Sequence, residues 1–510
     1  MTSGKRLLRL LETIRILQLG TEDWNACYKL PEYVDLTCSF AFECAPRSPY
    51  DIVFVDRMLS ENELELLHEA TKAHCLYVVD GLCLNKPMQY YFKCKMGKYI
   101  QRDEIPYFLA NEAKNYFPKP YGEKFMPGRV SIAQGFTGSV SWNGNYSIDL
   151  EGDYGEKLTQ IAFWRNNIPV FEGQAIDFWL EYKKDEDVEI ALMITQFRQG
   201  SISEIQQKWV FTEDELKDIV VVDNQMATGP IFATLLAKGS GKLQIIALHD
   251  RYSRRGHGMF LPGGERYVTS NREEIFYYFD PGDMKPPLHV YFSGYKTMQG
   301  FEGYYMMRKM GCPFLLIAEP RLEGGCFYMG DEEYEKAVAD IIRKHAKELG
   351  FKNNQVILSG LSMGTYGALY YGCDILPHAM ILGKPLASIG DVAENERLHR
   401  PGGFPTSLDV LNYTVGNTKE DAIQKLNDRF WKKFDATDWG QSKFVVAYMI
   451  EDDYDMTAYD RLISHLTADG VQVYGKGIHG RHNDATGPIA SWFKSQYTEI
   501  LRRDFARKVD

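Results

Sequence analysis

One stretch decides the fold of the C-terminal part of this chain: Gln355-Val-Ile-Leu-Ser-Gly-Leu-Ser-Met-Gly-Thr-Tyr-Gly-Ala-Leu-Tyr370. Its apolar residues predict a short buried strand, and the small residues that follow predict a helix. Ser362 stands between them, with Gly360 and Gly364 on either side in a G-x-S-x-G pattern. This pattern is typical of a nucleophile elbow, which presents a serine hydroxyl above a sheet. The alternative is a tight turn that needs glycine but has no chemical role.

The length, charge and cysteines of the whole chain limit what it can be. A chain of 510 residues is too long for one core, so several domains are expected. The net charge of −11 does not suit the basic face that nucleic-acid binding needs, and no nucleic-acid partner is expected. The nine cysteines form no C-x-x-C pair, which predicts reduced thiols and no metal site.

The chain has no feature of a secreted or membrane-spanning protein. Arg9 and Glu12 interrupt the apolar stretch near the N-terminus, so no signal peptide is expected there. No apolar run is long enough to span a bilayer. The sequence therefore predicts a cytoplasmic protein without a transmembrane segment, bound at most peripherally at the inner face of the cell membrane.

Changes in hydrophobic period divide the chain into three expected domains. Residues 1–125 alternate short apolar runs with helical patterns, which predicts a small Rossmann-like α/β unit; it lacks G-x-G-x-x-G, so no dinucleotide is expected. Residues 126–283 show a period of two, which predicts an antiparallel β-sandwich. Residues 284–510 return to strand–helix units, which predicts an α/β-hydrolase-like, doubly wound parallel sheet, with Pro286-Pro287 near its start.

The middle segment carries three finer expectations. Alternating apolar residues at 176–182 and 188–194 flank a charged turn and predict a hairpin with one buried face. The run 274–279 continues the β character of this segment. Its aromatic side chains could stack on sugar rings, or they could belong to the core or its rim; the three in question are Trp142, Tyr146 and Trp164.

An elbow serine of this kind needs an acid and a histidine later in the chain, in that order. The apolar strand at 443–450 is followed by the acidic run 451–455, and we expect Asp452 or Asp453 to be the acid because the strand ends there and the loop can turn inward. Glu451 still lies along the strand direction, and Asp455 is expected in solvent. The alternative is that the whole run is a solvated turn.

The histidine is expected in the loop between the last strand and the last helix, at 477–484. His482 is favoured because it lies nearer the helix start, and His479 is the alternative. The oxyanion hole is expected to use two backbone N–H groups. They are those of Met363, just after the serine, and of Tyr295, in the loop after the strand at 288–292.

Three features together resemble a known family: the Gly-Leu-Ser362-Met-Gly elbow, the Asp-rich turn after a strand, and Gly-Arg-His482-Asn-Asp near the end of the chain. With the three-part layout, they resemble the second of the accessory Sec system proteins, which streptococci and staphylococci use to export serine-rich-repeat adhesins. The resemblance covers essentially the whole chain. It implies an O-acetyltransferase that acetylates N-acetylglucosamine on the adhesin. Ser362 matches the nucleophile, His482 the base and Asp452 the acid, with the adjoining Asp453 as the other candidate.

The same resemblance implies partners. They are the sister accessory Sec proteins in a complex, the adhesin substrate and the accessory Sec motor ATPase. An acetyl donor of unknown identity would be required, and no bound cofactor is expected. Two alternatives remain at this point: an export chaperone or scaffold whose hydrolase fold is not catalytic, and a plain carbohydrate esterase.

Overall fold

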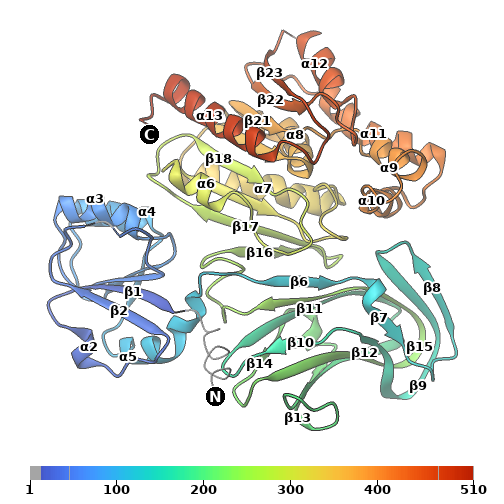
Figure 1. Cartoon of the computed structure of the whole chain (residues 1–510), viewed down its shortest axis with the longest axis horizontal. Coiled ribbons are helices and arrows are strands. Elements are labelled where there is room, and N and C mark those ends of the chain that lie inside the picture. The colour runs from blue at the N-terminus through green and yellow to red at the C-terminus, as the bar shows by residue number, and fades with distance from the viewer. Residues whose placement is uncertain (1–12, 45, 469, 509–510) are drawn as a thin grey trace.

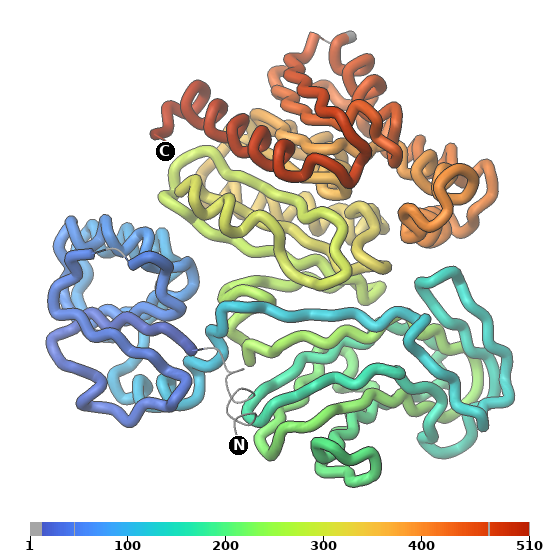
Figure 2. Tube along the Cα trace, viewed as in Figure 1, coloured from blue at the N-terminus to red at the C-terminus, as the bar shows by residue number. Residues whose placement is uncertain are grey.

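The computed structural model describes residues 13–44, 46–468 and 470–508. They contain three β-sheets that follow one another along the chain, with the N-terminal sheet beside the central one and the C-terminal sheet above it in Figure 1. The colour in Figure 2 passes from blue through green to red over the three parts in turn. Residues 1–12, in which the sequence predicts no signal peptide, lie outside the described residues. Among the described residues, no helix has the length and apolar character to cross a membrane.

The N-terminal sheet is parallel, in the strand order β2-β1-β3-β4-β5. Helix α3 begins at a capping box, in which the Ser60 side chain accepts from the Glu63 N–H and the Glu63 side chain accepts from the Ser60 N–H. The expected α/β unit is therefore confirmed as a parallel sheet with helices. Its elements are β1 (Ile14–Leu19), α2 (Trp24–Cys27), β2 (Val34–Ser39), β3 (Ile52–Val55), α3 (Glu61–Ala70), β4 (Leu76–Val79), α4 (Lys86–Cys94), β5 (Lys98–Ile100) and α5 (Ile105–Tyr107).

The central sheet is antiparallel and is organised around its longest strand, β15 (Gly229–Tyr252). Residues of β15 alternate between buried and partly exposed, which gives the sheet one apolar face over a core. The antiparallel character is confirmed; because β15 joins the ten strands into one hydrogen-bonded set, the two-layer sandwich stays a prediction. The other strands are β6 (Gly122–Phe125), β7 (Val130–Ile132), β8 (Ser139–Asn143), β9 (Ser147–Trp164), β10 (Ile168–Val170), β11 (Ala175–Lys184), β12 (Val188–Phe197), β13 (Ile205–Thr212) and β14 (Val220–Asp223).

The expected hairpin at 176–194 is wrong. Strand β11 pairs with residues 243–252 of β15 and β12 pairs with residues 231–239, so each lies beside a different part of the same strand. Gly239, at the end of the first part, and Gly241, between the two parts, both have positive φ. Alternation in a sequence reports which face is buried, but it does not report which strand is the partner.

Two strands lie in a different sheet from the one expected. Strand β17 (Glu274–Asp280) pairs with β19 of the C-terminal sheet, although the sequence assigns 274–279 to the middle segment. Strand β6, expected in the N-terminal unit, pairs with β15. A strand at a segment boundary has the same local pattern whichever sheet it joins. The domain boundaries at 125/126 and 283/284 stay predictions.

The C-terminal sheet has the order β16-β17-β19-β18-β20-β21-β22-β23, parallel from β19 to β23 with two antiparallel strands at one edge. Apolar residues of α7 to α12 cover one face of this sheet, and those of α6 and α13 cover the other. The strands are β16 (Glu265–Val268), β17, β18 (Leu288–Phe292), β19 (Phe314–Ala318), β20 (Val356–Leu361), β21 (Ala379–Gly383), β22 (Lys443–Met449) and β23 (Gln472–Ile478). The helices are α6 (Tyr304–Lys309), α7 (Glu332–Glu348), α8 (Met363–Ile375), α9 (Ile389–Leu398), α10 (Thr406–Val415), α11 (Glu420–Asp435), α12 (Ala458–Ala468) and α13 (Thr486–Phe505).

This topology determines where functional side chains can meet. Strands β20, β21, β22 and β23 are neighbours and parallel, so their carboxyl ends lie along one edge of the sheet. The elbow serine follows β20, the acidic run follows β22, and the histidine loop follows β23. Side chains from three distant segments of the chain therefore come together at this edge.

Candidate active site

Ser362 occupies a strained turn between β20 and α8. Its backbone has φ 53° and ψ −122°, a conformation that residues other than glycine rarely adopt and that costs about 1–3 kcal/mol. The turn is held because the Ser362 N–H donates to the Gly383 carbonyl of β21 at 2.8 Å. A Cβ on Gly360 would lie 2.2 Å from the Gly364 carbonyl carbon, and one on Gly364 would lie 2.1 Å from the Phe292 carbonyl oxygen. The glycines of the pattern are thus required by close backbone packing.

The structure brings Ser362, His482 and Asp452 into one line of hydrogen bonds. Ser362 Oγ lies 2.8 Å from His482 Nε2, and His482 Nδ1 lies 2.9 Å from Asp452 Oδ2. The His482 side chain is buried, and the Asp452 side chain is largely buried with 9% of it exposed. With its Nδ1–H donated to the carboxylate, the imidazole presents an unprotonated Nε2 to the serine hydroxyl, which is the arrangement that proton removal from a serine requires.

Asp453 contacts the same histidine in another way. Its Oδ1 accepts from the His482 backbone N–H at 3.0 Å, and its Oδ2 pairs with Arg400 Nε at 3.0 Å. Asp453 therefore holds the loop that carries His482, while Asp452 holds its ring.

The remaining candidates of the two loops lie away from Ser362 or serve another purpose. His479 is 84% exposed and pairs with Glu451 at 2.9 Å, so this alternative histidine faces solvent. Asp455 is not in solvent as expected: it is buried and accepts from the Ala387 and Ser388 N–H groups at 2.9 and 2.7 Å. Burial raises its pKa to about 6. The acidic run turns inward at Asp455 because these two amides supply the hydrogen bonds that its carboxylate needs.

Sequence reasoning missed the aromatic support of the histidine. The Tyr454 ring stacks on the His482 imidazole, with centroids 4.3 Å apart and planes 6° apart. The Arg400 guanidinium lies 4.4 Å from the centroid of the Tyr454 ring, and Phe404 stacks beside it at 5.5 Å. The only sequence signal was a tyrosine inside the acidic run; nothing local pointed to Arg400 or Phe404, which come from the connection between α9 and α10.

The two expected oxyanion donors lie on the elements that the sequence assigned to them. Met363 is the first residue of α8, where a backbone N–H has no partner within the helix. In the loop after β18, the Gly294 N–H donates to Glu302 Oε2 at 2.8 Å, and the Ser293 carbonyl accepts from the Tyr328 hydroxyl at 2.7 Å. Because Gly294 is committed to Glu302, Tyr295 is the next N–H of this loop that can serve.

Comparison with known proteins assigns the family. A family model described as accessory Sec system GspB-transporter matches residues 14–507. The chain belongs to this family. An accessory Sec system protein of Streptococcus gordonii is 38% identical over 506 residues, covering 97% of this chain and 99% of its own. One from Staphylococcus aureus is 40% identical over 513 residues, covering 97% of each. The resemblance drawn from the motifs is confirmed.

A solved structure also matches this accessory Sec chain over almost its full length. It is a Glycosylation Associate Protein complex from Streptococcus agalactiae, with a TM-score of 0.86, 33% identity, and coverage of 98% of this chain and 100% of that one. The matched chain, which is part of that complex, therefore has the same three sheets in the same order.

The three aromatic residues considered for sugar stacking in this family member differ in exposure. Trp164 is buried, and Tyr146 packs edge-on against Tyr413 of α10 with centroids 5.7 Å apart. Trp142 on β8 is 51% exposed. The core or rim interpretation holds for the first two, and only Trp142 of the three presents a large ring to solvent.

Proposed function

We propose that this accessory Sec protein is an O-acetyltransferase that acetylates N-acetylglucosamine on a serine-rich-repeat adhesin and takes part in the export of that adhesin. The observation that carries the proposal is the single line of hydrogen bonds from Ser362 through His482 to Asp452. A strained serine, a buried imidazole and a largely buried carboxylate in this order are the components of nucleophilic acyl transfer.

The reaction would begin with the acetyl donor. His482 Nε2 takes the hydroxyl proton as Ser362 Oγ attacks the acetyl carbonyl, and the negative charge that develops on the carbonyl oxygen is met by the N–H groups of Met363 and Tyr295. Collapse of the tetrahedral species expels the donor's leaving group, which takes the proton from His482, and leaves an acetyl-serine. A sugar hydroxyl then attacks the acetyl-serine with His482 again as base, which forms the sugar ester and restores the serine.

The sheet supports an α/β-hydrolase assignment for this part of the chain. The elbow follows β20, the acid follows β22 and the histidine precedes α13, which is the chain order of serine, acid and histidine expected in that fold. Helices on both faces and an antiparallel edge accord with the same assignment.

Partners are proposed from the relatives. The matched solved structure is a complex of glycosylation-associated proteins, which supports a complex of this chain with its sister accessory Sec proteins. We place the complex in the cytoplasm, at or near the inner face of the membrane, where it would meet the adhesin and the accessory Sec motor ATPase. A non-catalytic scaffold is the second candidate, and the observation that favours it is the same full-length match to an assembly subunit.

The test replaces Ser362 with alanine in the native host. Acetylation of the adhesin glycans is read by mass spectrometry, and export by the amount of adhesin at the cell surface. The proposal expects acetyl groups to disappear from N-acetylglucosamine in the variant. Full acetylation in cells that carry only Ser362→Ala would contradict the enzymatic role and favour the scaffold. If the wild-type protein turns over acetyl esters but the adhesin glycans are the same in wild-type and Ser362→Ala cells, a plain esterase is favoured instead.

A further inference from the structure

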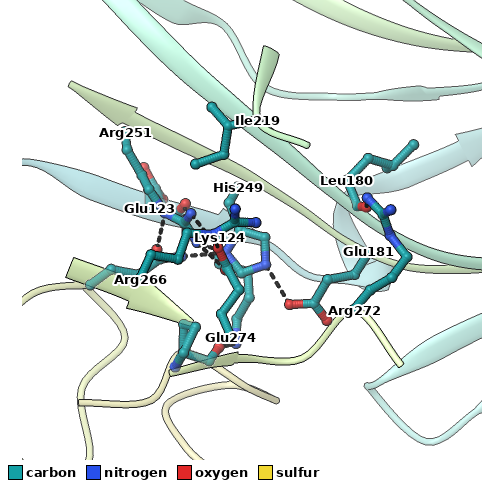
Figure 3. A network of polar contacts seen from close by, with 12 residues as sticks. Glu123, Lys124, Leu180, Glu181, Ile219, His249, Arg251, Arg266, Arg272 and Glu274 are labelled. Atoms are coloured by element: carbon teal, nitrogen blue, oxygen red, sulfur yellow. Dashed lines mark hydrogen bonds and ion pairs between the residues drawn. The ribbon is translucent and has the colours of Figure 1, made fainter. Parts of the chain in front are cut away.

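Gln299 joins the loop after β18 to the central sheet. This loop, residues 293–303, carries Tyr295, and Gln299 lies four positions after it. The Gln299 side chain enters a buried polar network between the central and C-terminal sheets. Figure 3 shows this network, with His249 near its centre and linked to Glu181.

Gln299 makes four hydrogen bonds to two strands of the central sheet, β15 and β6. Gln299 Oε1 accepts from Arg251 Nε at 2.6 Å, and Gln299 Nε2 donates to His249 Nδ1 at 2.6 Å, both on β15. The same amide nitrogen lies 3.2 Å from the Glu123 carbonyl oxygen of β6. The Gln299 backbone N–H donates to the Gly122 carbonyl at 2.8 Å.

The network leaves only one orientation for each polar group. Arg251 can only donate, so the atom facing its Nε must be the amide oxygen of Gln299. His249 Nδ1 receives hydrogen bonds from both Gln299 and Arg251 Nη2, the latter at 3.0 Å, so it is an acceptor. The imidazole proton is therefore on Nε2, which lies 2.6 Å from Glu181 Oε1. Burial, with the charge of Arg251, lowers the pKa of His249 and keeps it neutral.

The same place offers a possible cation site, which the charges argue against. Glu181, His249 and Glu274 have ligand atoms within 4.8 Å of one another. However, Glu274 accepts hydrogen bonds from both Arg251 and Arg266, so a divalent cation would stand beside two fixed guanidinium groups. In this arrangement the arginines already balance the carboxylate, and the cluster serves as a junction between sheets.

Hydrogen bonds hold the loop at Gln299, and apolar packing holds it two residues later, where Phe301 packs edge-on against Phe260 with ring centroids 6.0 Å apart. A cavity of about 20 Å³ lies under it, lined in part by Lys124, Gly294 and Gln299 itself. The start of the loop is held separately: the Ser293 N–H donates to the Ile317 carbonyl of β19 at 2.9 Å, and the Tyr328 hydroxyl donates to the Ser293 carbonyl. Tyr295 thus lies between an anchor on the C-terminal sheet and one on the central sheet, and the Lys296 N–H next to it donates to the Gly324 carbonyl at 3.3 Å.

We infer that Gln299 is a positioning residue that fixes the Tyr295 N–H for the oxyanion hole, which makes the central sheet part of the catalytic unit. This inference rests on the proposed function, because it assigns a task to the Tyr295 amide. Misplacement of such a donor by about 1 Å can cost on the order of 100-fold in rate. A neighbouring residue outside the network should have no such effect.

The test compares Gln299→Met, which keeps the length of the side chain but none of its hydrogen bonds, with Gln299→Glu, which keeps an acceptor for Arg251 but offers no donor to His249. Met298→Ala, at an exposed position of the same loop, is the matched control. For each protein, kcat and KM are measured with a small acetyl ester, and hydrogen exchange is measured on the peptide that covers 293–303. Thermal melting of the full chain shows whether each variant is folded.

We expect kcat to fall by about 10-fold or more in both Gln299 variants with KM within about twofold of wild type, and exchange of the loop peptide to accelerate. The Met298→Ala control should match wild type in kcat, in KM and in the exchange of the loop peptide. Unchanged kcat in a variant whose loop exchanges faster would overturn the catalytic part of the inference, and unchanged exchange would overturn the anchoring. If wild type transfers acetyl neither to water nor to N-acetylglucosamine, both alone and in complex with its accessory partners, the proposed function fails, and the exchange comparison still decides the anchoring.

Discussion

Asp452 and Asp453 are neighbours in the chain, and each holds a different group of the same histidine. Asp452 accepts from the ring Nδ1 of His482, and Asp453 accepts from its backbone N–H. Both residues lie in the loop after β22, which ends at Met449, and there one carboxylate reaches the ring while the other reaches the backbone of the histidine loop. The pair thereby separates two tasks, orientation of the imidazole and placement of the loop.

Because Asp452 and Asp453 have separate tasks, we expect their substitutions to lower kcat by unequal amounts. Asp452→Asn should lower kcat for a small acetyl ester by about 10²- to 10⁴-fold, because the amide no longer favours the tautomer that presents an unprotonated Nε2 to Ser362. Asp453→Asn keeps an acceptor for the His482 N–H and should cost less than about 10-fold. Asp460→Asn, an exposed carboxylate on α12, serves as the control. Equal losses in the first two variants would refute the division of tasks.

The stack of Tyr454 on His482 should matter through its ring and not its hydroxyl. Tyr454→Phe keeps the stacked ring and loses only hydrogen bonds with Gly403 and Asn483, so its kcat should stay within about twofold of wild type. Tyr454→Leu removes the ring, and kcat should fall about threefold to tenfold, as expected from the energy of an aromatic pair. Steady-state kinetics on folded protein measures both, and a larger loss in Tyr454→Phe would show that the stack is not the relevant contact.

The elbow glycines should be intolerant of a single methyl group. In Gly364→Ala the added Cβ would lie 2.1 Å from the Phe292 carbonyl oxygen, so the backbone must shift and unfolding should need on the order of 1–3 kcal/mol less free energy. Gly487→Ala in the first turn of α13 meets nothing within 4 Å and should be neutral or slightly stabilising. Denaturant titration compares the two. Equal stability of the two variants would mean that the elbow can relax at no cost.

Asp250 should make stability depend on pH. Burial, with the charge of Glu123 next, raises its pKa to about 7, and neither carboxyl oxygen has a hydrogen-bond partner among the described residues. The folded protein binds this proton more tightly than the unfolded chain does. The stability that the protonated Asp250 carboxyl contributes to the fold is therefore fully present below about pH 4, and it is lost as pH rises through about 7.

Asp250→Asn removes this titration, so the variant should gain stability relative to wild type between pH 5 and pH 8, by about 1 kcal/mol or more. Melting curves at the two pH values measure the difference. Glu186→Gln, in an exposed turn, should show none. A difference between Asp250→Asn and wild type that does not change with pH would contradict the shifted titration.

Features that depend on residues close in sequence could be predicted well. The strand–turn–helix around Ser362 and the capping box at Ser60 follow from side chains within a few positions of one another. The chain order of serine, acidic run and histidine loop also followed, because parallel strands bring their carboxyl ends to one edge. Local pattern and topology together therefore predicted which segments meet.

Features that depend on distant partners could not be predicted. Strands β11 and β12 alternate as a hairpin would, yet each pairs with a part of β15. Asp455 looked solvated in the sequence, and its burial is decided by the amides of Ala387 and Ser388, 68 and 67 positions away. The choice between Asp452 and Asp453 likewise needed the direction of each carboxylate, which no local pattern carries.

The most direct test of the central claim, an activated Ser362, is labelling by a fluorophosphonate probe followed by intact-mass measurement. Wild type, Ser362→Ala and His482→Ala are compared as folded full-length proteins, with His479→Ala as the control in the same loop. The account predicts a single adduct on wild type and on the control, none on Ser362→Ala, and strongly slowed labelling of His482→Ala. Absence of an adduct on wild type, both alone and in complex with its accessory partners, would contradict the account; so would an adduct that persists in Ser362→Ala.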